Sequence, residues 1–577
     1  MKRVFPSAFL LSAALIAFLC YTPSVRAQHP HQHEHVPAEE AGRVNFRVSC
    51  KPEAQRQFNR AVAWLHSFEY QEAEKAFTKV PELDPRCGMG YWGIAMSNYH
   101  PLWAPPTADE LQRGTSAMEK ANATGAQTQR ERDYIAAIAV FYKNAETLDH
   151  RKRAFAYSDA MKQLYRLRPT DREAGVFYAL TLVATGMMSN DKLYLREKEA
   201  VQILTRVQRL EPQHPGVAHY IIHSFDYPAL AKLALPAARS YAKFAPASSH
   251  AQHMPSHIFT RLGLWNEAIR SNLDARSSAK AHAVKHRLPG AFDQQLHAMD
   301  YLTYAYLQGA RDKEALGVFD ELMKIQSVEP QSFAVAYSAT AIPARYALER
   351  RRWDEAAKLA LPQSVDASAS PANFPLKSFP WQRFPWAVAH VHYARAIGAA
   401  RSGDVASARQ DVEKLSAIQK ALVEVKGGYD WAKQVEIERQ VASAWVAYAE
   451  GNHEESVKLM RAAADLDDAT DKHPVTPGAI LPAREQLGEL LIELKQPAAA
   501  VPEFEASLQI SPNRFNGLYG AARAARSAVD PKKARLYYGK LIELSRHADS
   551  VRPEIAEAKA FIGGRNGKDS AGISGKL

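Results

Sequence analysis

Apolar residues recur along most of the chain at the spacing of amphipathic helices, and these helices group into pairs. In the first pair, small and aromatic residues alternate along the packing face and a proline follows the second helix, at Ala61, Trp64, Ala73, Phe77 and Pro85. Small residues let two antiparallel helices approach, aromatic residues fill the space between them, and proline ends a helix. The pattern therefore predicts a helical hairpin of about 34 residues.

The same pattern returns along the chain, which we interpret as a repeat array. Its small, aromatic and proline positions recur at Ala200, Pro212, Gly263, Ala268, Ala315, Phe319, Ala356, Ala396, Ala408, Ala444, Gly488, Ala500, Phe504, Pro512, Ala522, Ala534 and Tyr538. The pattern resembles the tetratricopeptide repeat (TPR), with roughly ten hairpins over 52–548. Because such a hairpin buries its apolar face only against its neighbours, the sequence predicts an all-α TPR-type solenoid, a right-handed superhelix. We expect a cap and tail over 549–577.

The first residues have a different pattern. A short basic start precedes an apolar run that is too short to span a bilayer comfortably, and a small-x-Ala pattern ends at Ala27. We predict a cleavable signal peptide over 1–27 and a mature protein in the periplasm or outside the cell. Attachment of a lipid at Cys20 is the alternative. No later segment approaches about 20 consecutive apolar residues, so we predict no membrane span.

The segment 28–51 is rich in histidine and has little apolar surface to bury. Its histidines alternate with other residues at His29, His31, His33 and His35. Such a segment would either capture Cu(II), Ni(II) or Zn(II) loosely or serve as a solvated tail.

Two cysteines would remain after signal removal, Cys50 and Cys87. Each precedes the first helix of one of two successive hairpins, and these helix starts are neighbours in a stacked array. An even pair of cysteines in an oxidising compartment is a candidate disulfide, so we predict that the two are bonded.

Composition excludes several classes of protein. The chain is 46% hydrophobic, which allows an extensive core. Its formal charge is +11, but the basic residues are scattered, so we predict no nucleic-acid-binding surface. No P-loop, dinucleotide fingerprint or nucleophile triad indicates an enzyme class of those kinds.

Over most of its mature length the chain also resembles a widespread group of secreted bacterial TPR proteins. The resemblance rests on GRVNFRVSC, AVAWLHSFEYQEAEKAF, DPRCGMGYWGIAMSNYHPLW, HMPSHIFTRLGLWNEA, DKHPVTPGAILPAREQLGELL and PNRFNGLYGAARAA. It implies a fold and a location rather than an activity. It also implies that the segments 253–257 (HMPSH) and 472–478 (KHPVTPG) are features of the group.

The strongest chemical signal is a crowd of histidines in the middle of the chain, within 39 residues, at His219, His223, His250, His253 and His257. Two pairs among them have the i,i+4 spacing that places both imidazoles on one helical face, as metal sites on helices require. Pro255 interrupts the second pair, which would put the first histidine of that pair in the loop that enters the helix.

The repeat register brings further polar residues to the same place. The concave groove of such a solenoid is lined by the first helix of each hairpin. Counting back from the small residues of the second helices puts the groove positions of two successive units at His250, His253, His257, His297, Asp300 and Tyr304.

We therefore predict a metal site made from three or four of His219, His223, His253, His257, His297 and Asp300. Imidazoles with one carboxylate suit Zn(II), Cu(II), Ni(II) or Fe(II). Four ligands would make a structural site, whereas three would leave a position for an activated water. The alternative is a groove in which these side chains pack or bind a peptide without any metal.

A second polar group lies toward the C-terminus, at groove positions of two adjacent units: Glu485, Glu489, Asn516, Tyr519, Arg523 and Arg526. The acidic helix would either form salt bridges with the basic helix or leave the two arginines free to hold the carboxylate of a peptide terminus.

These features favour an exported scaffold that binds a peptide or protein partner in its concave groove, with a divalent metal held by the central histidines. The runner-up is a metal-dependent hydrolase or oxidase, and a third option is a protein that handles metal itself. The sequence does not distinguish an enzyme from a non-enzyme here, and it leaves the oligomeric state open.

Overall fold

The computed structural model describes residues 41–102, 105–189, 191–362, 374–425 and 428–564, all within one compact unit, Ala38–Leu577. The predicted signal peptide, the histidines at 29–35 and the end of the predicted tail lie outside the described residues.

The described residues form helices almost throughout, which confirms the predicted all-α solenoid. The helices of the first half are α1 (Pro52–His66), α2 (Tyr70–Leu83), α3 (Gly88–Ser97), α4 (Ala108–Thr124), α5 (Gln129–Tyr142), α6 (His150–Leu167), α7 (Arg172–Met187), α8 (Leu195–Leu210), α9 (Pro215–Ser224), α10 (Ala231–Phe244), α11 (Ser249–His253), α12 (Pro255–Arg261) and α13 (Trp265–Lys285). The second half contains α14 (Asp293–Gln308), α15 (Asp312–Lys324), α16 (Phe333–Leu348), α17 (Trp353–Ala357), the 3-10 turn η2 (Trp381–Arg383), α18 (Pro385–Ser402), α19 (Val405–Val423), α20 (Trp431–Ala449), α21 (His453–Asp468), α22 (Ala483–Glu493), α23 (Pro497–Ile510), α24 (Phe515–Ser527), α25 (Pro531–Leu544) and α26 (Pro553–Gly563).

A two-residue parallel ladder interrupts this pattern. It pairs β1 (Ala291–Phe292) with β2 (Val328–Glu329) beside the start of α14.

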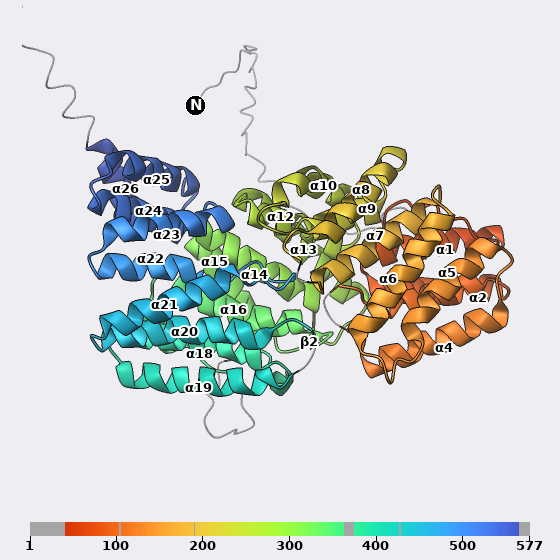
Figure 1. Ribbon diagram of the computed structural model, residues 1–577, viewed down its shortest axis with the longest axis horizontal. Helices are drawn as coiled ribbons and strands as arrows, with labels where there is room; N and C mark the ends of the chain where they lie inside the picture. The colour runs from red at the N-terminus through yellow and green to blue at the C-terminus, as the bar shows by residue number, and fades with distance from the viewer. Residues whose placement is uncertain (1–40, 103–104, 190, 363–373, 426–427, 565–577) are drawn as a thin grey trace, which may run out of the picture. The chain divides into compact units, whose positions relative to one another are not determined.

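Consecutive helices pack side by side, so the colour in Figure 1 changes gradually from one hairpin to the next. Helices that are distant in sequence also pack together: α1 packs on α9, and α14 packs on α24. The chain thus brings its N-terminal hairpin against its central repeats.

Small residues allow this close packing. In α22 and α24, Gly488 and Gly520 lie on the two sides of the buried Phe504 ring of α23. Ring and backbone are in direct contact there, because no side chain intervenes. This is the physical reason for the small-residue signature that the sequence shows.

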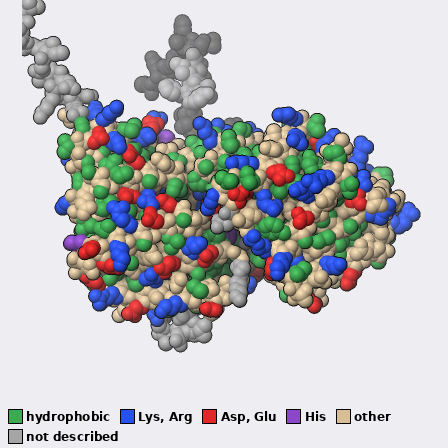
Figure 2. Space-filling model, viewed as in Figure 1, with side chains coloured by type: hydrophobic (Ala, Val, Ile, Leu, Met, Phe, Trp, Pro, Cys, Tyr) green, Lys and Arg blue, Asp and Glu red, His purple; other side chains and the backbone are tan. Residues whose placement is uncertain are grey.

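Two observations concern the outer helices and the visible face of the described residues. None of the described helices is both long and apolar enough to cross a bilayer. Figure 2 shows acidic and basic side chains interspersed over the visible face, with little histidine. Most of the central histidines are buried instead.

A disulfide joins Cys50 and Cys87 across 37 residues of sequence. It links the segment before α1 to the start of α3, next to the aromatic cluster around Phe46 and Trp92. The cross-link restrains the first hairpin in the unfolded chain as well as in the folded one.

Replacing Gly520 by alanine should lower the free energy of unfolding by about 1–3 kcal/mol. An added Cβ would lie 2.2 Å from the Phe504 ring, so the tightly packed ring or helix must move. Gly539→Ala in α25 is the matched control: nothing lies within 4 Å of its Cβ position, and alanine should stabilise that helix by about 0.5–1 kcal/mol. Urea unfolding followed by circular dichroism would measure both, and equal effects of the two changes would contradict this packing.

Candidate metal centre

Six buried histidines from four helices form two groups of three. Helix α9 supplies two of them, α11 two, α12 one and α14 one. The first triad is His219, His223 and His250, and the second triad is His253, His257 and His297. In each triad, one ring nitrogen per histidine lies within 4.8 Å of the others.

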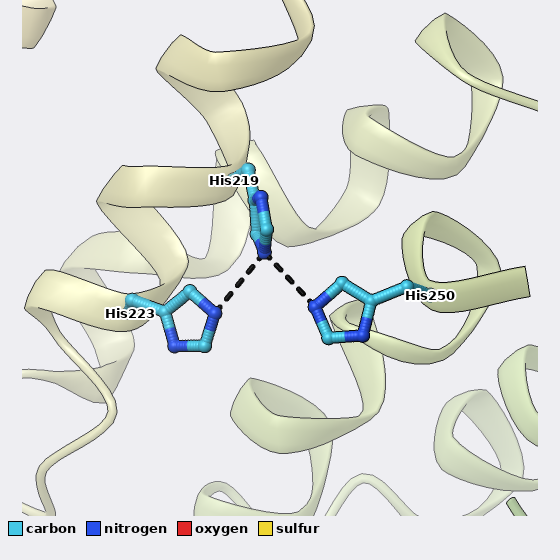
Figure 3. A group of neighbouring side chains, drawn as sticks. All are labelled: His219, His223 and His250. Atoms are coloured by element: carbon cyan, nitrogen blue, oxygen red, sulfur yellow. Dashed lines mark hydrogen bonds between the residues drawn. The ribbon is translucent and has the colours of Figure 1, made fainter. Parts of the chain in front are cut away.

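In the first triad the three rings converge on one point (Figure 3). His219 lies in the middle, with its Nε2 atom 3.1 Å from Nε2 of His223 and 3.1 Å from Nε2 of His250. The Nδ1 atom of His219 lies 2.6 Å from the carbonyl oxygen of His66. A carbonyl oxygen only accepts, so this Nδ1 carries the proton and Nε2 carries the lone pair.

The second triad also brings three imidazole rings together, but different residues orient them. The Nε2 atoms of His253 and His257 are 3.1 Å apart, and the rings of His253 and His297 lie 4.1 Å apart between centroids. Nδ1 of His253 lies 2.6 Å from Oδ1 of Asn272. The Asn272 amide donates through Nδ2 to the carbonyl of Ala268 at 2.7 Å, which leaves Oδ1 as the acceptor.

In the second triad, a carboxylate fixes the ring of His257. Nδ1 of His257 lies 3.1 Å from Oδ2 of Asp226. Lys472 and Arg261 also bind that carboxylate, at 2.9 Å and 2.8 Å, and they hold the pKa of Asp226 well below its usual value against the opposing effect of burial. The carboxylate is thus an acceptor for the Nδ1 proton of His257.

Helix α11 explains why the two triads are adjacent. His250 and His253 are three residues apart, so their side chains leave the helix on neighbouring faces. One reaches the first triad and the other reaches the second. Pro255 begins the next helix, α12, where its missing N–H costs nothing, so His253 ends a short helix rather than lying in a loop.

Burial keeps all six imidazoles neutral. It is the main cause that lowers the pKa of every histidine in both triads, to about 3 in His250. In five of the six, neighbouring histidines lower it further. A neutral imidazole offers one lone pair, which is the form that binds a metal.

The geometry of the second triad has a direct chemical consequence. His253 and His257 both use their Nδ1 protons elsewhere, so two Nε2 lone pairs face each other at 3.1 Å. Two lone pairs repel unless a cation lies between them. Two nitrogens bound to one tetrahedral ion at 2.0–2.1 Å are about 3.3 Å apart, close to this separation.

Two further groups of this kind occur among the described residues. His66 and His214 both bond to Glu173, each at 3.0 Å, and His66 also bonds to Tyr220. In that cluster the carboxylate of Glu173 accepts from both histidines, so their Nε2 atoms are paired with an acceptor rather than with each other. At the surface, His282 and His286 stack near Glu72, but Lys75 binds that carboxylate at 2.8 Å. Neither group has facing lone pairs like those of the second triad.

The remaining central candidates have other partners. Asp300 pairs with Arg345, and both side chains are fully buried. Tyr304 accepts a hydrogen bond from Arg514 at 2.8 Å. The structure therefore places His250, predicted for the groove, among the histidines of a triad, and Asp300 apart from both triads.

The C-terminal candidates contact one another and their neighbours. Glu485 binds Arg514 at 2.9 Å, and Glu489 binds Arg351 at 2.9 Å. The same network includes Asn516 with Glu349, Arg523 with Glu489, and both Tyr519 and Arg526 with Glu557. Of the two arginines in the prediction, Arg523 thus pairs with Glu489 of the acidic helix, whereas Arg526 pairs with Glu557.

Most of the residues that support the triads could not be predicted from the sequence. Asn272 and Asp226 lie outside the helices of the histidines that they orient, and no spacing links them to those histidines. Arg261 lies four residues after His257 in α12 and binds Asp226. Lys472 is the exception, since it lies in the 472–478 loop that the resemblance marks. That loop also contacts the centre through Val475, whose carbonyl accepts from Tyr301 at 3.2 Å.

Comparison with known proteins supports only the repeat architecture. The family model described as tetratricopeptide repeat matches residues 481–514. No curated protein matches the chain. Solved structures that are similar include the APC/C hetero-tetramer Cut9-Hcn1, at 12% identity and a TM-score of 0.32 over 89% of this chain and 76% of that one. The human IFIT1 dimer with m7Gppp-AAAA is 10% identical with a TM-score of 0.35, over 87% and 91% of the two chains. A tetratricopeptide repeat protein from Parabacteroides merdae is 10% identical with a TM-score of 0.22, over 74% and 98%.

One buried carboxyl next to the first triad should titrate near neutral pH. Glu69 accepts hydrogen bonds from Ser248 at 2.7 Å and from the backbone N–H of His250 at 3.4 Å. Burial nevertheless raises the pKa of Glu69 from 4.5 to about 7. The folded protein therefore holds this proton more tightly than the unfolded chain does.

The contribution of Glu69 to stability is present below pH 4.5 and is lost as the pH rises to about 7. Glu69→Gln removes this titration, so the variant should gain stability relative to the wild type across that range, by about 3 kcal/mol, and then hold a constant difference. Chemical unfolding at several pH values would measure this difference in the free energy of unfolding. Glu53→Gln, at an exposed site on α1, is the control. A difference between Glu69→Gln and the wild type that does not change with pH would contradict the raised pKa.

Proposed function

We propose that the chain binds two transition-metal ions in its central repeats, one in each histidine triad. The observation that carries the proposal is the pair of facing Nε2 lone pairs of His253 and His257, 3.1 Å apart, with both Nδ1 protons committed to other acceptors. Such an arrangement is unfavourable when empty and favourable around a cation. The first triad supports the same conclusion, since one lone pair of His219 faces two histidine nitrogens.

The outer contacts also fit a metal centre. Metal-bound histidines commonly donate their second ring N–H to a carbonyl, an amide or a carboxylate, which fixes the ring and the tautomer. His219, His253 and His257 each have such an acceptor. The donor atoms are all imidazole nitrogens, which suit zinc, copper, nickel and iron(II) rather than magnesium or calcium.

Each triad would leave at least one coordination position open. A metal ion with three protein ligands and an open position can bind water or a substrate, whereas a closed site of four ligands is structural. The arrangement is therefore consistent with a metal-dependent hydrolase or oxidase as well as with metal handling. We propose catalysis only as the consequence of that open position.

Partner binding is the second candidate function. Tetratricopeptide repeats are interaction scaffolds in general, and residues 481–514 match that repeat. We propose that a peptide or protein binds the concave groove, away from the internally paired Glu485 and Glu489. Arg526 remains about half exposed and lies at the edge of the network, so it is the arginine best placed to meet a partner.

We also propose that the protein is exported after cleavage behind Ala27. The disulfide between Cys50 and Cys87 supports this, because disulfides persist in oxidising compartments. Cell fractionation followed by mass spectrometry should find a chain that begins at Gln28 outside the cytoplasm, with that disulfide formed. A full-length chain in the cytoplasm with two free thiols would contradict the proposal.

Elemental analysis of the untagged protein tests the metal proposal. The wild type should hold two metal ions per chain, and His219→Ala/His223→Ala should lose one of them. His253→Ala/His257→Ala should lose the other, because two of three ligands disappear in each case. His392→Ala is the control: this histidine is equally buried but pairs with Asp411, away from both triads.

Helicity measured by circular dichroism separates loss of metal from loss of fold. A wild-type protein that stays metal-free after incubation with zinc and with copper would refute the metal proposal and leave partner binding as the function to pursue.

A further inference from the structure

The two triads are close enough to act as one centre. The rings of His223 and His257 belong to different triads, yet their centroids are 6.3 Å apart. Within the first triad, His223 and His250 are 6.4 Å apart. His219, the middle ring of the first triad, is nearer to His223, at 4.8 Å. The rings of the two triads are thus neighbours, which places the two proposed ions close enough to share a small ligand.

The charge of the pocket restricts the kind of ion. Among the described residues, no carboxylate joins either triad. The nearest one, Asp226, is bound by two cations, Lys472 and Arg261. Two divalent ions would place four positive charges among neutral ligands in a buried site, where uncompensated charge is costly.

Two monovalent ions need only half that compensation. Copper(I) is the first-row metal that is stable as a monovalent ion, and imidazole is one of its protein ligands alongside thiolate and thioether. Three ligands per ion also suit copper(I), which accepts a low coordination number. The ligand count and the charge therefore favour copper(I), and the imidazole donors are compatible with it.

Access to the centre is limited to small molecules. His219 and His253 are almost completely buried, at 0% and 1% exposed, whereas His223, His250 and His297 are 5–7% exposed. Solvent thus reaches each triad only at the edge of these side chains. This exposure suits a small molecule such as a diatomic one and excludes a folded partner or a polymer from the metal positions.

We propose, on the basis of the two-metal function above, that the triads hold a pair of copper(I) ions which bind dioxygen between them. Each copper(I) gives one electron to dioxygen, so both ions become copper(II) and dioxygen becomes a bridging peroxide. No bond to a proton is made or broken. The total charge of ions and ligand is two positive charges before and after, so the buried pocket needs no counterion to accommodate the step.

The test uses the full mature protein, loaded with copper(I) under anaerobic conditions and then exposed to dioxygen. We expect two coppers per chain and a new, intense near-ultraviolet absorption from peroxide-to-copper charge transfer. Although both ions are then copper(II), their spins should couple through the bridge and give almost no electron paramagnetic resonance signal. Hydrogen peroxide added to the copper(II) protein should produce the same absorption.

Single-ligand variants provide the matched comparison. His223→Ala weakens the first triad and His297→Ala the second, so each should keep one copper and lose the absorption. When loaded directly with copper(II), each should show the full resonance signal of an isolated copper(II) ion. His392→Ala should behave like the wild type. Should an alanine variant lose helicity, glutamine at the same position keeps most of the side-chain volume without the imidazole.

The outcomes separate this inference from the metal proposal itself. Two coppers per chain with full resonance intensity, or a copper(I) protein that does not react with dioxygen, would overturn the shared centre while the two metal sites stand. Two tightly held zinc ions that copper cannot replace would overturn the choice of copper. A protein that binds no metal would overturn both.

Discussion

The central repeats depend on one electrostatic constraint, which is that neutral imidazoles are buried with their lone pairs facing one another. The Nδ1 protons of His253 and His257 are fixed by an amide and a carboxylate, so the facing Nε2 atoms of this pair cannot exchange roles to form an ordinary hydrogen bond. A polar group buried without a partner costs free energy, and two facing lone pairs add repulsion. A metal ion removes both costs at once.

This constraint also explains why distant parts of the chain converge on the triads. The carbonyl of His66 comes from the end of α1, Asn272 from α13, and Lys472 from the loop that precedes α22. A solenoid whose repeats contact only their nearest neighbours would not bring these residues together. The contact of α1 with α9 makes the N-terminal hairpin part of the support for the centre.

The C-terminal repeats also bury polar side chains, but there the side chains of the protein itself neutralise one another. Arg514 is fully buried and binds Glu349 and Glu485, each within 3.0 Å, together with Tyr304. Removing one partner of such a network would leave an unpaired buried charge, which is more costly than the pairs are favourable. The two regions show two ways in which the fold neutralises polar residues on its inner helices: ion pairs in one, and lone pairs arranged around a common point in the other.

The sequence alone determined the helical repeats, because small and aromatic positions record how closely two helices pack, as Gly488, Phe504 and Gly520 do. It also indicated the histidines of α9, α12 and α14, since i,i+4 spacing and repeat register are local properties of a helix.

The division into two triads came only from the tertiary structure. His250 and His253 are neighbours in sequence but point to different triads, and the direction of each depends on how α11 packs against α9, α13 and α14. Asp226 and Asn272 carry no local signal, since their role is to meet a ring nitrogen that another part of the chain presents.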